Sequence, residues 1–265
     1  MDARLIGDRL TVTVVEPYPG AAALSRRFPA IYVLDPSATL DIVVGAKRLF
    51  DIFSGGALPL TYFIGIGYAD PDIEARRFRD FTPSEAGLPT ELNPSLTFGL
   101  GGASRYLEVI RTEIIPELEA RYPLDPNDRA LMGYSLSGLF AAHVLFERPD
   151  TFARYLVISP SLWWDQARIF KDEEAWAAAH GDLPAKVFLV GGAAEEEPGG
   201  GWRNNLPDDI VLPLKLVTHL RTLGERLAAR NYPSLRVKTA FIPDGRHISV
   251  FPAAVGFGLI GLFGL

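Results

Sequence analysis

Residues 133–138 read Gly-Tyr-Ser-Leu-Ser-Gly and place a serine among small residues. An apolar, strand-like run ends at Met132, and a helix-like run begins at Leu139. A serine on a sharp turn between a strand and a helix holds its hydroxyl clear of the backbone, and the helix start behind it offers a free amide for an oxyanion. The pattern predicts Ser135 as a nucleophile and the amide of Leu136 as an oxyanion donor. The competing interpretation is a small residue in an ordinary tight turn.

A serine hydroxyl needs a base to become a strong nucleophile, and the chain has 4 histidines. His143 lies about two helical turns beyond the serine, His180 precedes a strand-like run, and His219 is in the middle of a helix-like run. His247 follows the last strand-like run, where the base belongs when nucleophile, acid and histidine follow one another along a sheet. His247 is therefore the predicted base, with a simple helix-start histidine as the alternative.

The acid that orients the base should follow the strand-like run 186–190, which lies between the serine and His247. Glu195, Glu196 and Glu197 come shortly after that run. A buried carboxylate there would accept a hydrogen bond from the imidazole and fix its tautomer. Glu195 is nearest the strand end and is the predicted acid, with Glu196 as the alternative and Asp208, Asp209 and Asp244 as weaker options. A solvated acidic loop is the competing interpretation.

A second oxyanion donor is expected from the loop after an early strand. The segment Asp35-Pro36-Ser37-Ala38 follows the apolar run 30–34. Pro36 has no amide hydrogen. The amide of Ser37 is therefore the predicted second donor.

Strand-like and helix-like runs alternate along the chain, which predicts an α/β fold with a mostly parallel sheet and helices on both faces. Helix-like runs span 106–118, where Pro116 is expected to kink the helix, and 214–229. Two stretches rich in proline and glycine, 82–102 and 196–212, are predicted as long loops. No domain boundary is evident, so residues 1–265 are predicted to form a single domain. The strand-like runs span 10–15, 30–34, 61–68, 129–133, 155–159, 186–190 and 235–242.

Composition excludes several classes of function. The net charge of −6 argues against a nucleic-acid partner, and the absence of cysteine excludes disulfides and thiolate metal sites. No metal or other cofactor is predicted, because the histidines lack the spacing of metal ligands and no phosphate-binding loop is present.

Residues 248–265 carry no charge, but their glycines and Pro252 favour a buried helix over a membrane span. A cytoplasmic location is expected, and the sequence leaves homo-oligomerisation open.

Several segments together resemble a known family. The chain resembles the putative esterase family of α/β-hydrolases, which includes esterase D-like enzymes and enterochelin-type siderophore esterases. The Ser-Pro-Ser-Leu-Trp-Trp segment is the most specific part of the resemblance. The segments that carry it are 32–35, 64–68, 79–83, 133–140, 159–164 and 245–247.

The resemblance implies an α/β-hydrolase fold, Ser135 as the nucleophile and His247 as the base. It also implies that Trp163 and Trp164 border the substrate pocket, where they could stack on an aromatic or apolar group or simply pack in the core. Ser137 and Pro36 replace glycines that many family members have. The acidic position varies in the family, and some members work with a Ser-His pair alone.

These observations predict a serine hydrolase that cleaves carboxylic esters through an acyl-enzyme. Its small-molecule substrate is expected to be a siderophore lactone or an aryl or acyl ester, and Tyr134 is a further candidate for the pocket. Arg76, Arg77 and Arg79, expected in the loop after residues 61–68, could hold an anionic or catechol-like substrate or form a solvated surface. Arg79 is the arginine retained as a pocket candidate. The alternatives are an acyltransferase with the same acyl-enzyme and a non-catalytic binding protein with the same fold.

Overall fold

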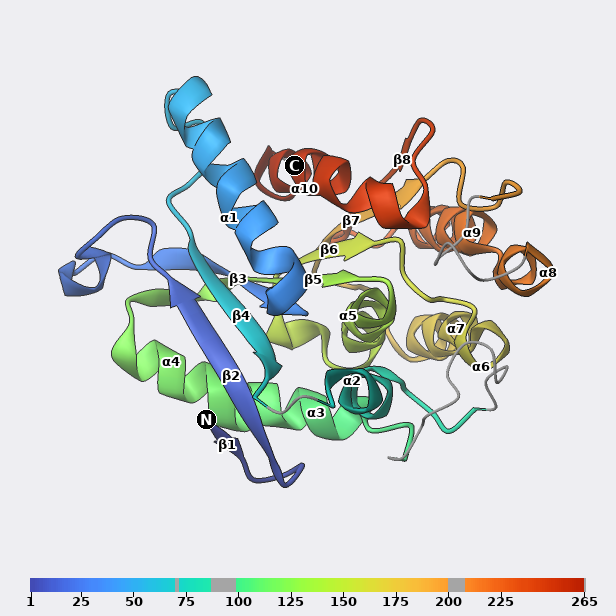
Figure 1. Cartoon of the computed structure of the whole chain (residues 1–265), viewed down its shortest axis with the longest axis horizontal. Helices are drawn as coiled ribbons and strands as arrows, with labels where there is room; N and C mark the ends of the chain where they lie inside the picture. Colours follow the sequence, from blue (N-terminus) through green and yellow to red (C-terminus); the bar gives the residue numbers. More distant parts are fainter. Residues whose placement is uncertain (70–71, 87–98, 200–207, 265) are drawn as a thin grey trace.

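One sheet of eight strands organises the protein, in the order β1-β2-β4-β3-β5-β6-β7-β8 (Figure 1). The computed structural model describes residues 1–69, 72–86, 99–199 and 208–264. Strands β3 to β8 run parallel, whereas β2 is antiparallel to β4 and β1 is antiparallel to β2. The strands are β1 (Asp2–Ala3), β2 (Asp8–Val15), β3 (Phe28–Leu34), β4 (Tyr62–Tyr68), β5 (Leu124–Tyr134), β6 (Arg154–Ile158), β7 (Lys186–Gly192) and β8 (Arg236–Ile242).

Helices cover both faces of the sheet, which confirms the predicted α/β class. Helices α1 and α10 pack on one face and contact each other (Figure 1). Helices α2, α3, α4, α5, α7 and α9 contribute buried side chains to the core on the other face. The α-helices are α1 (Pro36–Phe53), α2 (Ile73–Phe81), α3 (Ala103–Val109), α4 (Ile115–Arg121), α5 (Leu136–Glu147), α6 (Trp164–Ala167), α7 (Ile169–Ala179), α8 (Asp208–Val211), α9 (Leu216–Ala229) and α10 (His247–Gly264).

The chain changes direction across the sheet at β3. It moves from β3 to β4 on one side and returns to β5 on the other, so β3 lies between them. In open parallel sheets, ligands bind at the carboxyl ends of the strands where the order reverses in this way. The turn at Ser135, which follows β5, and the segment around Ser37, which follows β3, end at this same edge.

One expectation about local structure needs correction. The three arginines expected in a loop lie on helix α2, whose apolar positions Ala75, Phe78 and Phe81 are buried. Charged residues separate these positions and obscure the short helix in the sequence. The helix-like run predicted over 106–118 contains a wide π-helical turn, η2 (Ile110–Ile114), which joins α3 to α4 just before Pro116. A proline lacks its amide and crowds the preceding turn, which a wider turn relieves.

Helix α10 is long and apolar enough to cross a membrane, but half of it is buried within the protein. Its glycines explain how closely it packs on the sheet. A methyl group at Gly258 would lie 2.5 Å from a Leu156 side-chain carbon, and one at Gly261 would lie 2.8 Å from the Phe188 ring. The glycines of this apolar run therefore serve close packing of the helix against β6 and β7.

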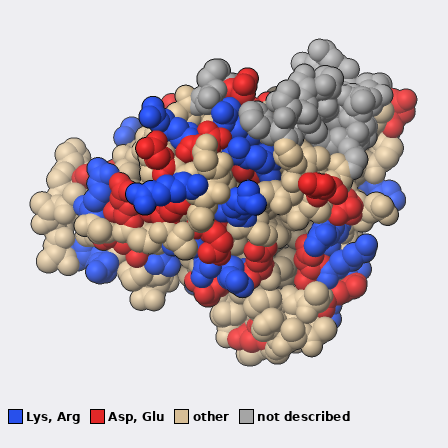
Figure 2. All heavy atoms as spheres, turned by 90° about the horizontal axis from the view of Figure 1, so that it is seen from below, with Lys and Arg blue, Asp and Glu red and all other residues tan. Residues whose placement is uncertain are grey.

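Charges of both signs are interspersed on the face seen from below the sheet (Figure 2). Ion pairs between neighbouring helical turns account for part of this pattern. Arg111 pairs with Glu108 at 2.7 Å, and Arg121 pairs with Glu117 at 3.2 Å.

The predicted loops 82–102 and 196–212 lie partly outside the described residues, and the second of them contains α8.

Candidate active site

Ser135 forms the turn between β5 and α5. Its backbone is strained, with φ 59° and ψ −115°, and glycines on both sides make the turn possible. A methyl group at Gly133 would lie 2.1 Å from the Ser137 carbonyl oxygen, and one at Gly138 would lie 3.0 Å from the Pro160 backbone. Ser137 hydrogen-bonds through its hydroxyl to both the amide and the carbonyl of Tyr134, at 3.0 and 2.9 Å. That side chain therefore braces the turn.

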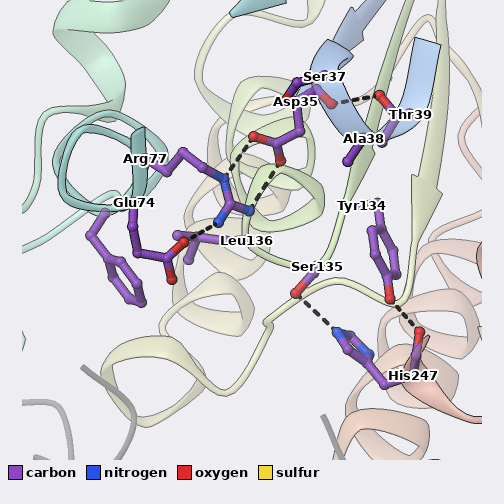
Figure 3. A pocket seen from close by; sticks show the side chains of 11 residues that line it. Asp35, Ser37, Ala38, Thr39, Glu74, Arg77, Tyr134, Ser135, Leu136 and His247 are labelled. Carbon is purple, nitrogen blue, oxygen red and sulfur yellow. Dashed lines mark hydrogen bonds and ion pairs between the residues drawn. The ribbon is translucent and has the colours of Figure 1, made fainter. Parts of the chain in front are cut away.

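His247 faces the serine. Its Nε2 lies 3.0 Å from the Ser135 Oγ, and the imidazole is almost fully buried (Figure 3). Tyr134 holds this histidine in two ways: its ring stacks on the imidazole with centroids 5.1 Å apart, and its hydroxyl donates a hydrogen bond to the His247 carbonyl. Burial, and secondarily the nearby Glu195 carboxylate, raises the pKa of the Tyr134 hydroxyl, so this donor stays protonated.

Glu195 lies behind the histidine. Its Oε1 is 3.7 Å from the His247 Nδ1, and its side chain is only 1% exposed. The same oxygen accepts hydrogen bonds from the Ser159 hydroxyl at 2.7 Å and from the Gly192 amide at 3.2 Å. The loop of Glu195 is joined to the loop before His247 by a hydrogen bond from the Ala194 amide to the Gly245 carbonyl, at 3.0 Å. The carboxylate is therefore rigidly placed beside the imidazole.

Glu196, the alternative acid, faces a different part of the protein. Its carboxylate accepts hydrogen bonds from the amide and hydroxyl of Thr218 on α9, at 2.6 and 2.8 Å. Of the two glutamates considered from the sequence, Glu195 is the one whose carboxylate faces the imidazole of His247.

The amides of Leu136 and Ser37 both lie in the first turns of helices, α5 and α1, where backbone donors have no partner within their own helix. Both residues line the cavity in front of Ser135. Pro36 fits closely against β4: methyl groups at Gly65 and Gly67 would lie 2.7 and 2.9 Å from its ring. The glycines of β4 thus make room for the proline that precedes Ser37.

Asp35 precedes α1 in the left-handed conformation, with φ 55°. Its carboxylate does not cap the helix. It forms a two-pronged ion pair with the Arg77 guanidinium of α2, at 2.7 and 3.1 Å (Figure 3). Burial alone would lower the pKa of Arg77, but the Asp35 carboxylate outweighs burial and raises that pKa. The Asp35 carbonyl also accepts a hydrogen bond from the Thr39 hydroxyl at 2.9 Å, so the segment before Ser37 is fixed from both sides.

An open cavity of about 320 Å³ lies in front of the serine. Tyr134 lines it, as the sequence predicted for a pocket residue, whereas Trp163, Trp164 and Arg79 are not among the described residues that line it. The Arg79 guanidinium instead pairs with Asp80 and Asp8, at 2.7 and 3.0 Å. The lining residues are Asp35, Ser37, Ala38, Thr39, Glu74, Arg77, Phe78, Tyr134, Ser135, Leu136 and His247 (Figure 3).

Replacing Asp35 by asparagine tests whether its ion pair positions the Ser37 amide. Asparagine tolerates the left-handed backbone but carries no charge, so the turn is kept and the ion pair with Arg77 is lost. We expect kcat for a p-nitrophenyl ester to fall about tenfold at unchanged KM, because an oxyanion donor acts chiefly in the transition state. Glu74→Gln is the control, since Glu74 contacts the same guanidinium from within α2. A kcat for Asp35→Asn equal to that of Glu74→Gln would contradict the positioning role.

The comparison with family models decides which family this site belongs to. Residues 3–196 match the model described as "Putative esterase". The chain belongs to this Putative esterase family. It is a carboxylic ester hydrolase, as the sequence predicted.

Individual relatives extend the match over most of the chain. The chain is 29% identical to the ferri-bacillibactin esterase BesA of Bacillus subtilis, over 88% of this chain and 78% of that protein. It is also 29% identical to the siderophore triacetylfusarinine C esterase of Aspergillus fumigatus, over 89% of this chain and 81% of that protein. The crystal structure of a BES protein from Bacillus cereus superposes with a TM-score of 0.81, covering 99% of this chain and 93% of that chain at 26% identity. The fold is that of an α/β-hydrolase.

Sequence reasoning missed the supporting roles of three residues in this Putative esterase site. Ser159 was noted only within the resembling segment, although its hydroxyl binds the Glu195 carboxylate. Asp35 and Arg77 come from segments more than 40 residues apart, and their ion pair becomes visible only in three dimensions. The cluster of arginines at 76–79 was a usable signal, but it could not distinguish Arg77, which faces the cavity, from its neighbours.

Proposed function

We propose that the chain hydrolyses the ester bonds of siderophores through an acyl-enzyme on Ser135. The contact between the Ser135 Oγ and the His247 Nε2, 3.0 Å apart at the edge of an open cavity, carries this proposal. The names of its relatives support the substrate class, because the Bacillus subtilis protein is named a ferri-bacillibactin esterase and the Aspergillus fumigatus protein a siderophore triacetylfusarinine C esterase.

In the acylation step, the Ser135 oxygen attacks the ester carbonyl while His247 accepts the hydroxyl proton at Nε2. The carbonyl oxygen becomes an oxyanion and accepts hydrogen bonds from the amides of Leu136 and Ser37. The imidazolium then gives its proton to the leaving alcohol, the carbon–oxygen bond of the ester breaks, and the acyl group remains on the serine.

In the deacylation step, water takes the place of the departed alcohol. His247 removes a proton from this water, which attacks the acyl carbonyl, and the serine oxygen leaves with the proton that the imidazole returns. Glu195 stabilises the imidazolium in both steps, because its buried carboxylate faces the Nδ1 atom. The products are a carboxylic acid and an alcohol.

A fluorophosphonate probe tests the proposed nucleophile. The serine oxygen should displace fluoride and form a bond to phosphorus, which adds the mass of the probe less that of hydrogen fluoride to the peptide that contains Ser135. Tandem mass spectrometry locates the label, and release of acid from a ferric siderophore ester before and after labelling reads the activity. Labelling at another residue, or full hydrolysis by the labelled protein, would refute the assignment. Hydrolysis of p-nitrophenyl esters without any hydrolysis of siderophore esters would refute the substrate class alone.

A further inference from the structure

A second cavity, of about 530 Å³, lies beside the one in front of Ser135. Its walls come from three segments of the chain: residues 85–86, residues 163–167 and residues 213–219. The chemistry described above uses none of its side chains. Among the described residues, its lining consists of Glu85, Ala86, Trp163, Trp164, Asp165, Gln166, Ala167, Pro213, Leu214, Lys215 and His219.

The two cavities share an aromatic wall. Phe78 lines the cavity of Ser135, Trp164 lines the second cavity, and their ring centroids are 6.3 Å apart. Trp164 is fixed in this wall, because its side chain is 1% exposed and its Nε1 donates to the Ser84 carbonyl at 3.3 Å. The backbone also connects the two sites, since the Ser161 amide donates to the Ser135 carbonyl at 3.0 Å. The Phe78–Trp164 contact and the Ser161 hydrogen bond therefore connect the walls of the two cavities.

The second cavity offers a flat apolar surface. Trp163 is only half-buried, and Leu214 and Leu216 pack against it. Its ring and that of Trp164 are 6.0 Å apart and tilted by 48°. The exposed part of the Trp163 ring favours stacking with a planar ring of a ligand, and the buried Trp164 ring supports it.

Polar groups surround this apolar surface. The Lys215 ammonium is exposed and forms no ion pair with the described carboxylates. Burial lowers the pKa of His219, and the Glu196 carboxylate opposes that shift only in part, so the imidazole is neutral near pH 7 and can donate or accept a hydrogen bond. Glu85 adds an acceptor. Hydroxyl groups on a planar ring could be bound by all three side chains.

The backbone of this wall is unusual. Asp165, Gln166 and Ala167 have consecutive positive φ values of 49°, 55° and 59°. The left-handed conformation costs free energy at each of three successive residues other than glycine. Strained backbone of this kind clusters at binding and active sites. The Asp165 carboxylate, which accepts a hydrogen bond from the Ser84 hydroxyl at 2.7 Å, ties this segment to the opposite wall.

We propose that the second cavity binds a hydroxylated aromatic arm of the substrate while another arm of the same molecule presents its ester to Ser135. This inference rests on the proposed function. Ferric iron binds about six oxygen atoms, so an iron chelator carries several bidentate arms. The open cavity of about 320 Å³ in front of the serine is at the small end of the range for small-molecule sites, so a ligand with several arms would extend beyond it. Binding of a remote arm would raise kcat/KM for multi-arm esters selectively.

The test compares substrates that differ in the number of arms. The substrates are p-nitrophenyl acetate, the methyl ester of N-(2,3-dihydroxybenzoyl)serine with one arm, and the cyclic trilactone of that acid with three. For Trp163→Ala, we expect kcat/KM to fall about tenfold for the trilactone and less than about twofold for the other two. Lys215→Gln, an exposed change that leaves the fold intact, should act in the same direction by about threefold.

Matched controls separate the remote site from a general loss of structure. Trp176→Ala removes a partly buried tryptophan that stacks on His180, away from both cavities, and Lys171→Gln removes an exposed lysine from α7. Equal falls in kcat/KM for all three substrates would overturn the inference. So would an unchanged kcat/KM for the trilactone in both Trp163→Ala and Lys215→Gln. Control variants with the same effect as these two would overturn it as well. Hydrolysis of the single-arm ester but not of the trilactone would overturn it as well. If the unaltered chain cleaves none of the substrates, the proposed function itself fails.

Discussion

The Ser135→Ala variant is expected to lose hydrolysis of p-nitrophenyl esters by about 10⁴-fold or more in kcat. Alanine removes only the attacking oxygen, and the residue keeps the same strained turn between β5 and α5, so the melting temperature should change little. His247→Ala should cause a loss of similar size, because the serine and its base act as a unit. The double variant should be no worse than either single variant, and stopped assays with a chromogenic ester measure all three.

Ser137→Ala is the matched control for that experiment. Ser137 lies in the same turn, but its hydroxyl is buried and bonded to the backbone of Tyr134 rather than directed into the cavity. We expect this variant to lose about 1 kcal/mol of stability and to keep most of its activity. A Ser135→Ala variant as active as Ser137→Ala would show that the nucleophile lies elsewhere, and additive losses in the double variant would show that the two residues do not work together.

The second large effect concerns the acid. Replacing Glu195 by glutamine preserves its size but removes the charge that faces the imidazole, so kcat should fall about 10²-fold or more. Glu196→Gln should change kcat less than about twofold, because that carboxylate binds Thr218 and not the histidine. Hydrolysis of a p-nitrophenyl ester across the pH range measures kcat for both variants. The melting temperature separates a lost charge from a lost fold, since only a lost charge leaves it unchanged.

The separation of 3.7 Å between Glu195 and His247 makes this comparison informative. It is longer than a normal hydrogen bond, and contacts of this kind can tighten when substrate binds. Equal activity in the glutamine variants of Glu195 and Glu196 would mean that a Ser-His pair suffices for catalysis, as the sequence resemblance left open.

The sequence predicted those parts of the site that depend on local pattern and chain order. Ser135 was recognisable because small residues, a strand and a helix adjoin it. His247 was recognisable because one histidine of four follows the last strand. The predicted strands correspond to β2 through β8, since buried parallel strands are continuous apolar runs. Only the two-residue strand β1 gave no usable signal.

The supporting interactions could not be predicted, because they join segments that are distant in sequence. The Ser159 hydroxyl meets Glu195 only because β6 and β7 end side by side. Arg77 reaches Asp35 from a helix whose polar composition concealed it. The burial of the two adjacent tryptophans could not be predicted either, because two aromatic residues in a row do not indicate which ring is buried. In the structure, Trp164 is buried and Trp163 is half-buried.

The close contact between α1 and α10 has a consequence for how the rate can be tuned. The proposed base is the first residue of α10 and the proposed Ser37 donor is in the first turn of α1, whereas the nucleophile belongs to the opposite layer, on the turn from β5 to α5. Because α1 and α10 contact each other, we expect the base and the donor to move together, as one body, relative to the serine. Packed interiors transmit small displacements rather than absorbing them. A bulkier residue at Gly258 or Gly261, remote from any bound ester, would lift that body off the sheet and slow the chemistry without altering a single residue that touches substrate.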